Sequence, residues 1–151
     1  MSKRVVTLGE IMLRLKAPAF ERFFQSPLLE ATFGGGEANV AISLAIFGLD
    51  VSFVTALPSN PIADACLRFL RGHGVDTSHI QRSGERMGIY FLEAGANQRP
   101  SNVVYDRAHA AIAATTAGSF DWDAVFAGAG WFHITGITPA LSETAAALSL
   151  Q

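Results

Sequence analysis

Residues 28–57 read LLEATFGGGEANVAISLAIFGLDVSFVTAL, and this stretch decides the fold. Leu28 to Phe33 is predicted to be a strand that runs into the glycine run Gly34-Gly35-Gly36. From Glu37 to Phe47 the apolar residues recur at helical spacing, until a glycine ends the helix. Val51 to Leu57 is a continuous apolar run, which is typical of a strand buried on both faces. The stretch therefore predicts a strand, a glycine turn, a helix and a second strand.

The same alternation of short apolar strands and helices extends in both directions along the chain. Val5 to Leu8 is predicted to form a strand that ends at Gly9, and Pro61 to Arg71 a helix that opens with proline. Such an alternation is typical of a mainly parallel sheet with helices packed on its faces. The predicted fold class is therefore α/β. The later elements are expected to be helices over 108–117 and 121–127, a strand over 130–135 and a helix from Pro139 to 150.

Two further regions are predicted to form strands outside this main sheet. Met12 to Leu15 is extended, and Met87 to Ala94 and Ser101 to Arg107 alternate apolar and polar residues on either side of a turn-rich connection. Because helices already cover both faces of a parallel sheet, a hairpin inserted into this pattern is expected to lie outside it. We expect a small β lid, with strands at about 12–33 and 87–107.

Length and composition indicate one globular domain over residues 1–151. Half of the residues are apolar, 16% are charged, and the net charge is −2 with a sequence pI of about 6.0. The chain has no basic region to attract nucleic acid or anionic lipid, and its apolar runs are shorter than the roughly 20 residues that span a bilayer. Cys66 is the single cysteine, which excludes an internal disulfide and fits a reducing compartment. We therefore expect a cytoplasmic protein with neither nucleic-acid nor membrane partners.

The glycine run Gly34, Gly35 and Gly36 is the first candidate binding site. Glycine lets backbone N–H groups come close to a ligand, and a helix N-terminus favours anions or hydroxyl oxygens. Asn39 lies in the predicted first turn, where its amide can both donate and accept hydrogen bonds. A tight turn that only packs the strand against the helix is the alternative. Spacing alone leaves both interpretations open.

Three residues of the predicted hairpin form the second candidate site. Tyr105 and Arg107 are two positions apart on one strand, so both side chains leave the same face, and Tyr90 on the partner strand can share it. A guanidinium binds a carboxylate with two hydrogen bonds, while a phenol offers a hydroxyl and a ring. This face therefore suits a polyol that carries a carboxylate. A solvated lid face with an amphipathic pair is the alternative.

Residues that often bind metals show no pattern typical of a metal site. The four histidines occupy different predicted elements without a repeated spacing, and Cys66 lies among apolar residues of a helix. We predict no metal site, and core or surface roles for these side chains. The histidines are His73, His79, His109 and His133.

Several motifs together carry a resemblance to a known family. They are Gly35-Gly36-Glu37-Ala38-Asn39-Val40-Ala41, Gly88-Ile89-Tyr90-Phe91, the run from Gln98 to Ala108, and Phe132-His133-Ile134-Thr135-Gly136-Ile137. From Val6 to about Ala140 the chain resembles the N-terminal half of ribokinase-like sugar kinases, the PfkB family, and among them the 2-keto-3-deoxygluconate kinases. In the first signature Pro58 stands where the family has a closing glycine.

The resemblance implies a function and a role for each candidate residue. Members of this branch transfer phosphate from Mg-ATP to 2-keto-3-deoxygluconate, and their lid sheets commonly pack together in homodimers. By this resemblance Gly34, Gly35, Gly36 and Asn39 would bind substrate hydroxyls, while Tyr90, Tyr105 and Arg107 would hold the keto-acid end.

The resemblance also implies that part of the kinase lies outside this sequence. Family members are about twice as long, and their second half carries the catalytic aspartate, which is the general base, and the nucleotide pocket. Gly128-Ala129-Gly130 is followed by Trp131, which cannot accept a proton, so we interpret this segment as a plain turn.

We therefore expect no catalytic residue in these 151 residues, and little activity from them alone. The helix that ends at Gln151 has no C-cap, which makes the sequence look truncated. The alternative is a complete noncatalytic product that binds a sugar acid or associates with itself.

Overall fold

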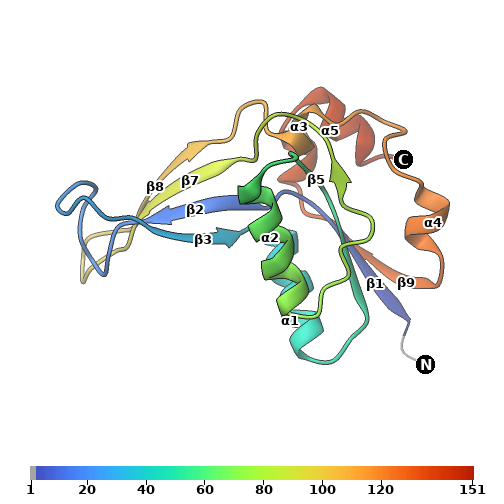
Figure 1. The fold of residues 1–151 in the computed structure, drawn as a ribbon, viewed down its shortest axis with the longest axis horizontal. Helices are drawn as coiled ribbons and strands as arrows, with labels where there is room; N and C mark the ends of the chain where they lie inside the picture. The colour runs from blue at the N-terminus through green and yellow to red at the C-terminus, as the bar shows by residue number, and fades with distance from the viewer. Residues whose placement is uncertain (1–2) are drawn as a thin grey trace.

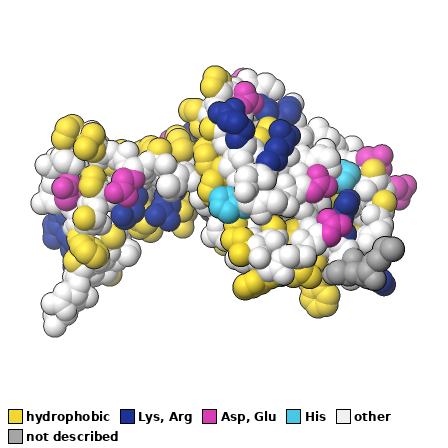
Figure 2. Space-filling model, turned by 60° about the horizontal axis from the view of Figure 1, so that its bottom comes forward, with side chains coloured by type: hydrophobic (Ala, Val, Ile, Leu, Met, Phe, Trp, Pro, Cys, Tyr) yellow, Lys and Arg dark blue, Asp and Glu magenta, His cyan; other side chains and the backbone are white. Residues whose placement is uncertain are grey.

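The computed structural model describes residues 3–151, so the first two residues of the predicted unit 1–151 lie outside the described residues. Figure 1 shows an α/β body from which a second, elongated sheet projects. In Figure 2 the same projection forms a smaller lobe, joined to the body by a narrower neck and carrying both basic and acidic side chains. Among residues 3–151, no helix is long and apolar enough to cross a membrane.

The body is built on a parallel sheet of three strands, which we call the central sheet. Its order is β4 (Val51–Val54), β1 (Arg4–Leu8) and β9 (Ala129–His133), and β1 pairs in parallel with both neighbours. Val6 at its centre is fully buried, as expected for a continuous apolar strand that packs on both faces. The parallel α/β arrangement predicted from the sequence is confirmed.

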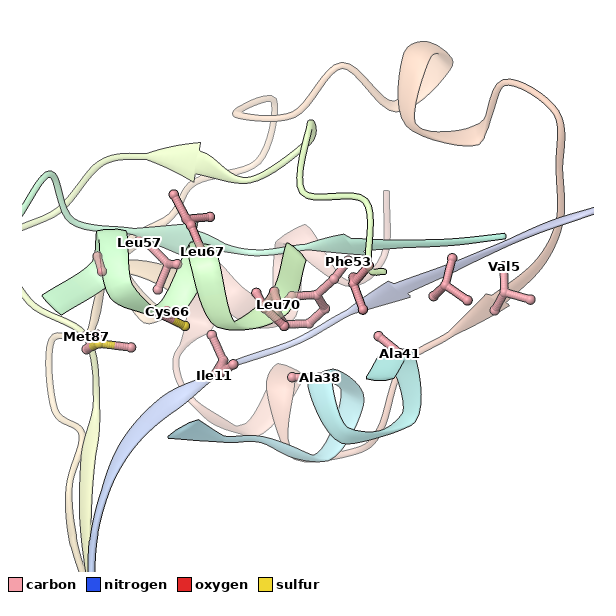
Figure 3. Close-up of a cluster of buried hydrophobic side chains, with 13 residues drawn as sticks. Val5, Ile11, Ala38, Ala41, Phe53, Leu57, Cys66, Leu67, Leu70 and Met87 are labelled. Atoms are coloured by element: carbon pink, nitrogen blue, oxygen red, sulfur yellow. The ribbon is translucent and has the colours of Figure 1, made fainter. Parts of the chain in front are cut away.

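Two helices cover one face of the central sheet. They are α1 (Gly36–Ile46) and α2 (Pro61–Gly72), and they pack against alternate residues of β1 and β4. Figure 3 shows Phe53 of β4 and Leu70 of α2 in this cluster. The sequence of α2 sets its start, because Asn60 accepts a hydrogen bond from the Ala63 N–H at 2.9 Å.

Shorter helices cover the opposite face. Val6, Leu8 and Val54, which alternate with the residues of the first cluster, pack there against residues of all three helices. The connection from β1 to β4 therefore passes over the face that α1 covers, and α4, on the opposite face, leads directly into β9. The three helices are α3 (Ala111–Ala114), α4 (Trp122–Phe126) and α5 (Glu143–Leu148).

The projecting sheet, which we call the outer sheet, has four strands. Their order is β3 (Glu30–Gly34), β2 (Met12–Lys16), β7 (Ile89–Glu93) and β8 (Asn102–Asp106). β2 and β7 pair in parallel, while the β2–β3 and β7–β8 pairs are antiparallel. The hairpin predicted outside the main sheet is thus one half of this outer sheet.

Residues at the base of the outer sheet join it to the body. Figure 3 shows Ile11 and Met87, which precede β2 and β7, in the same buried cluster as α2. Ile11 is 1% exposed and Met87 is 6% exposed, so this junction belongs to the core. The outer sheet therefore starts from a packed base.

The predicted strand over 51–57 was wrong as a single element. Beyond Val54 the chain forms a separate strand, β5 (Ala56–Leu57), which pairs with β6 (Gln81–Arg82) instead of β1. The reason is that β1 ends at Leu8 and its chain turns away toward the outer sheet. The strand predicted to start at Leu28 starts at Glu30.

Two predicted helices were also too long. The helix over 108–117 is only α3, because His109 has a positive φ of 58° and the Ala111 N–H donates to the Arg86 carbonyl. The helix from Pro139 is divided into a 3-10 turn, η1 (Thr138–Ala140), and α5. The division occurs because the Ser142 hydroxyl caps a new helix, accepting from the Ala145 N–H at 3.0 Å.

Candidate functional site

A pocket lies where the outer sheet meets the carboxyl ends of β1 and β9. In open α/β sheets ligands bind at this edge, at the point where the direction of the crossovers reverses, and here that point lies between β1 and β9. The structure brings together in this pocket all seven residues predicted as candidates: Gly34, Gly35, Gly36, Asn39, Tyr90, Tyr105 and Arg107. Its lining also includes five residues that sequence reasoning missed: Glu10, Met12, Glu37, Val103 and Ile137.

The glycine run connects β3 to the N-terminus of α1. A Cβ on Gly35 would overlap the backbone carbonyl of Glu10, so the close approach of these two segments requires glycine. Gly35 is the N-cap residue, and no side chain among the described residues caps α1 there. The first N–H groups of a helix have no partner within it, so they are available to a ligand. The turn therefore has a packing role and retains free donors.

Glu37 in the first turn of α1 is a buried anchor. Its side chain is 2% exposed, and its Oε1 accepts hydrogen bonds from the Thr135 N–H at 3.0 Å, the Thr135 hydroxyl at 2.7 Å and the Thr138 hydroxyl at 3.0 Å. Thr135 and Thr138 lie in the segment that follows β9. Glu37 thus ties the glycine run to the segment that contributes Ile137 to the pocket.

The tyrosines and the arginine lie together, as their spacing predicts. Tyr90 and Tyr105 are directly opposite on β7 and β8, with their ring centroids 6.0 Å apart. The Arg107 guanidinium carbon lies 5.5 Å from the centroid of the Tyr105 ring, which is within the range of a cation–π interaction. Arg107 immediately follows β8 and is not part of it, although its side chain still reaches the same pocket.

Arg107 forms an ion pair with Glu10, which the sequence analysis did not anticipate. The guanidinium Nη2 donates to Glu10 Oε2, while the Arg107 Nε has no hydrogen-bond partner among residues 3–151. Glu10 is 5% exposed. Burial raises the pKa of Glu10, the Arg107 charge lowers it and the Glu37 charge raises it further, with a net upward shift.

A signal for Glu10 was present in the sequence. It comes two residues after a buried parallel strand, and polar side chains that follow such strands meet at the ligand-binding edge of the sheet. The structure adds that Gly88 packs against this pair, because a Cβ there would lie 2.5 Å from Glu10 Oε1 and 3.2 Å from the Arg107 Cβ. Glu37 could not be found in this way, since its partners lie about a hundred positions further along the chain.

The described residues offer little else that is reactive. Residues 3–151 contain no group of three or more His, Cys, Asp or Glu side chains placed to hold a metal ion. Cys66 lies in the core of α2, where burial raises the pKa of its thiol to about 12, so the thiolate is rare at neutral pH. Gly128 has a φ of 75° and lies in the turn before β9, whereas Ala129, Gly130 and Trp131 belong to β9, so the plain turn predicted for this segment was right only at its first residue.

Replacing Glu37 with alanine should destabilise the protein strongly. The change leaves the Thr135 N–H and the buried Thr138 hydroxyl without their acceptor, and each unsatisfied group costs about 1–3 kcal/mol. The free energy of unfolding, measured by urea denaturation, should fall by roughly 2 kcal/mol or more. Glu143→Ala is the control, because Glu143 also lies in the first turn of a helix but is exposed. It should change stability by less than about 1 kcal/mol; equal losses would contradict the anchoring role.

Comparison with known proteins identifies the family. Residues 2–151 match the pfkB family of carbohydrate kinases. A 2-dehydro-3-deoxygalactonokinase from Haloferax volcanii is 38% identical over 95% of this chain and 45% of its own length. A 2-dehydro-3-deoxygluconokinase from Bacillus subtilis is 29% identical over 94% of this chain and 44% of its own length.

Solved structures agree with the sequence relatives. The crystal structure of a 2-dehydro-3-deoxygluconokinase from Thermotoga maritima superposes with a TM-score of 0.94 at 55% identity, over 97% of this chain and 45% of that one. The chain therefore spans about 45% of the length of the relatives that it matches. The family match over nearly the whole sequence, the shared fold and the 38% identity show that the chain belongs to the pfkB family of carbohydrate kinases.

Proposed function

We propose that these residues form the sugar-acid-binding part of a kinase that phosphorylates 2-keto-3-deoxygluconate, also called 2-dehydro-3-deoxygluconate, with ATP. The observation that carries the proposal is the pocket that joins a guanidinium and two tyrosines on the outer sheet to a glycine run and a helix N-terminus on the body. The names of the relatives support the same substrate class.

Each part of the pocket has a chemical role in this proposal. Arg107 binds the substrate carboxylate, because a guanidinium can offer two parallel N–H donors and its Nε has no partner among residues 3–151. Tyr90 and Tyr105 pack against the carbon chain and offer hydroxyls. The backbone N–H groups at the start of α1 and the Asn39 amide bind hydroxyls at the other end of the pocket. The substrate is thereby fixed at both ends before transfer.

The family implies ATP as the phosphate donor, usually with Mg²⁺, but the described residues do not suit this group. The pocket's single guanidinium is paired with Glu10, and residues 3–151 hold no cluster of metal-ligating side chains. Three phosphates with Mg²⁺ normally need several donors and a carboxylate for the metal. We therefore assign neither the nucleotide site nor the general base to these residues, and expect them in a part of the kinase beyond them.

The first test is a phosphoryl-transfer assay on the natural protein, purified from its source cells. We expect a mass near twice 16.1 kDa, and ATP-dependent phosphorylation of 2-keto-3-deoxygluconate. The 151-residue chain assayed in parallel is expected to show no turnover, because losing a general base alone costs on the order of 10²- to 10⁴-fold. A natural product near 16.1 kDa without transfer would contradict the proposal and favour a noncatalytic binding protein.

Replacing Arg107 with lysine in the natural protein should raise the apparent KM for the sugar acid by roughly tenfold or more. Lysine keeps the charge but loses the two-point geometry that holds a carboxylate. Arg86→Lys is the matched control, since Arg86 pairs with Asp106 at the same end of β8, outside the pocket. Steady-state kinetics should show a normal KM for the control. An unchanged KM in Arg107→Lys would exclude Arg107 as the carboxylate-binding residue.

We also propose that the outer sheet acts as a lid and pairs with a second copy of the chain. Val103 and Tyr105 line the pocket, so the alternation of the strand places Val104 on the opposite face. Leu15, Phe91 and Val104 are consecutive neighbours across β2, β7 and β8, and none of them is buried. An apolar sheet face of this kind favours association. The pocket side of the sheet stays free for the substrate.

Val104→Glu should convert the dimer to monomers, because it places a charge on this apolar face. Sedimentation velocity of the natural protein provides the measurement. Ile62→Glu is the control, since Ile62 on α2 is 49% exposed and Val104 is 48% exposed. A monomeric wild-type protein, or equal dissociation of both variants, would argue against pairing through the outer sheet.

A further inference from the structure

The pocket contains more carboxyl groups than cationic groups before any ligand enters. Among residues 3–151, its charged side chains are Glu10, after β1, Glu37 on α1 and Arg107, after β8, and the only other titratable groups lining it are the phenols of Tyr90 and Tyr105. Both carboxyl groups are almost fully buried, at 5% and 2% exposure. One guanidinium therefore faces two buried carboxyl groups.

A sugar acid adds a third carboxylate to this set. The inference rests on the proposed function, in which the substrate carboxylate binds at Arg107. The guanidinium is already paired with Glu10 Oε2, so the ligand must share or displace this partner. Like charges close together in a site shielded from water repel strongly, and the usual response is that one of the groups becomes protonated.

Glu10 has little room to move away. A Cβ on Gly88 would lie 2.5 Å from its Oε1, so this oxygen lies directly against the backbone at the start of β7. Its Oε1 is also buried and has no hydrogen-bond partner among residues 3–151. A proton on the Glu10 carboxyl group would remove its negative charge and turn one of its acceptor oxygens into a donor.

We propose that Glu10 takes up one proton from solvent when a sugar acid binds, so that the substrate carboxylate lies between the Arg107 guanidinium and a neutral Glu10 carboxylic acid. The proton adds to the Glu10 carboxylate, and no covalent bond to the ligand forms or breaks. A neutral sugar brings no charge and induces no uptake. Glu10 is in this way a specificity-determining residue, which adapts the charge of the pocket to an acidic substrate.

The direction of the linkage follows from the charges. Burial already raises the pKa of Glu10, and Arg107 is the group that lowers it. A ligand carboxylate that binds Arg107 reduces the effect of Arg107 on the Glu10 pKa and adds a negative charge nearby. The pKa of Glu10 is therefore higher in the complex than in the free protein. Between these two pKa values affinity falls as pH rises, by up to about tenfold per pH unit. Outside this window the titration of Glu10 does not change the affinity with pH.

Calorimetry on the natural-length protein tests the proposal directly. 2-Keto-3-deoxygluconate is titrated at each pH from 5 to 9 in two buffers of different ionisation enthalpy, both of which buffer at that pH. The difference in observed enthalpy between the buffers gives the number of protons taken up. We expect a maximum approaching one proton, at the pH where affinity falls most steeply.

Two variants assign the proton. Glu10→Gln keeps the shape and an acceptor for Arg107 but cannot titrate, so its proton uptake should vanish and its affinity should become flat across the window. Glu30→Gln is the control, because Glu30 is also ion-paired and lies in the outer sheet, yet its side chain is 53% exposed and lies outside the pocket. It should take up protons as the wild-type protein does.

Two results would overturn the proposal while the proposed function stands. One is phosphorylation and binding of the sugar acid without proton uptake in the wild-type protein. The other is an uptake that persists in Glu10→Gln. If the natural protein neither binds nor phosphorylates the sugar acid, the proposed function fails and the proton linkage fails with it. The wild-type measurement needs no variant, so the proposal stays testable if Glu10→Gln does not fold.

Discussion

The buried carboxyl group of Glu37 is the interaction on which the pocket depends. A carboxyl group that is removed from water must have its hydrogen bonds supplied by the protein, and here three donors from Thr135 and Thr138 supply them. Those donors lie about a hundred residues from Glu37 in sequence. Satisfying one side chain therefore sets the start of α1 against the segment after β9, and the pocket at this edge of the central sheet is formed between them.

The outer sheet brings the second half of the site to this edge. Ile11 and Met87 anchor its base in the core, and the strands that follow them carry Tyr90 and Tyr105 to the pocket. The Glu10–Arg107 ion pair then joins the end of β1 to the end of β8 across the pocket. The same two residues thus connect the sheets and define the charge that a ligand encounters. In the proposed function, an acidic substrate requires this charge to adapt.

Much of the fold could be predicted from local patterns. Continuous apolar strands and helices with punctuating glycines specified a parallel α/β body, and an alternating hairpin indicated strands outside it. The errors arose where a local pattern competed with a distant partner. The strand after Val54 changed partner because β1 turned away, and the last helix was interrupted because the Ser142 hydroxyl capped a new one. Neither the change of strand partner nor the new helix start at Ser142 has a signal in the local sequence as strong as that of the apolar run around it.

The sequence by itself determined the candidate residues for the proposed sugar-acid site. The glycine run with Asn39, and the strand spacing of Tyr105 and Arg107, follow from periodicity and side-chain chemistry, which are local properties. Only the tertiary structure decided that these residues share one pocket, and that Glu10 and Glu37 belong to it. The physical reason is that burial and pairing of charge depend on contacts between distant segments. A carboxyl group's environment, and hence its protonation, cannot be inferred from its neighbours in sequence.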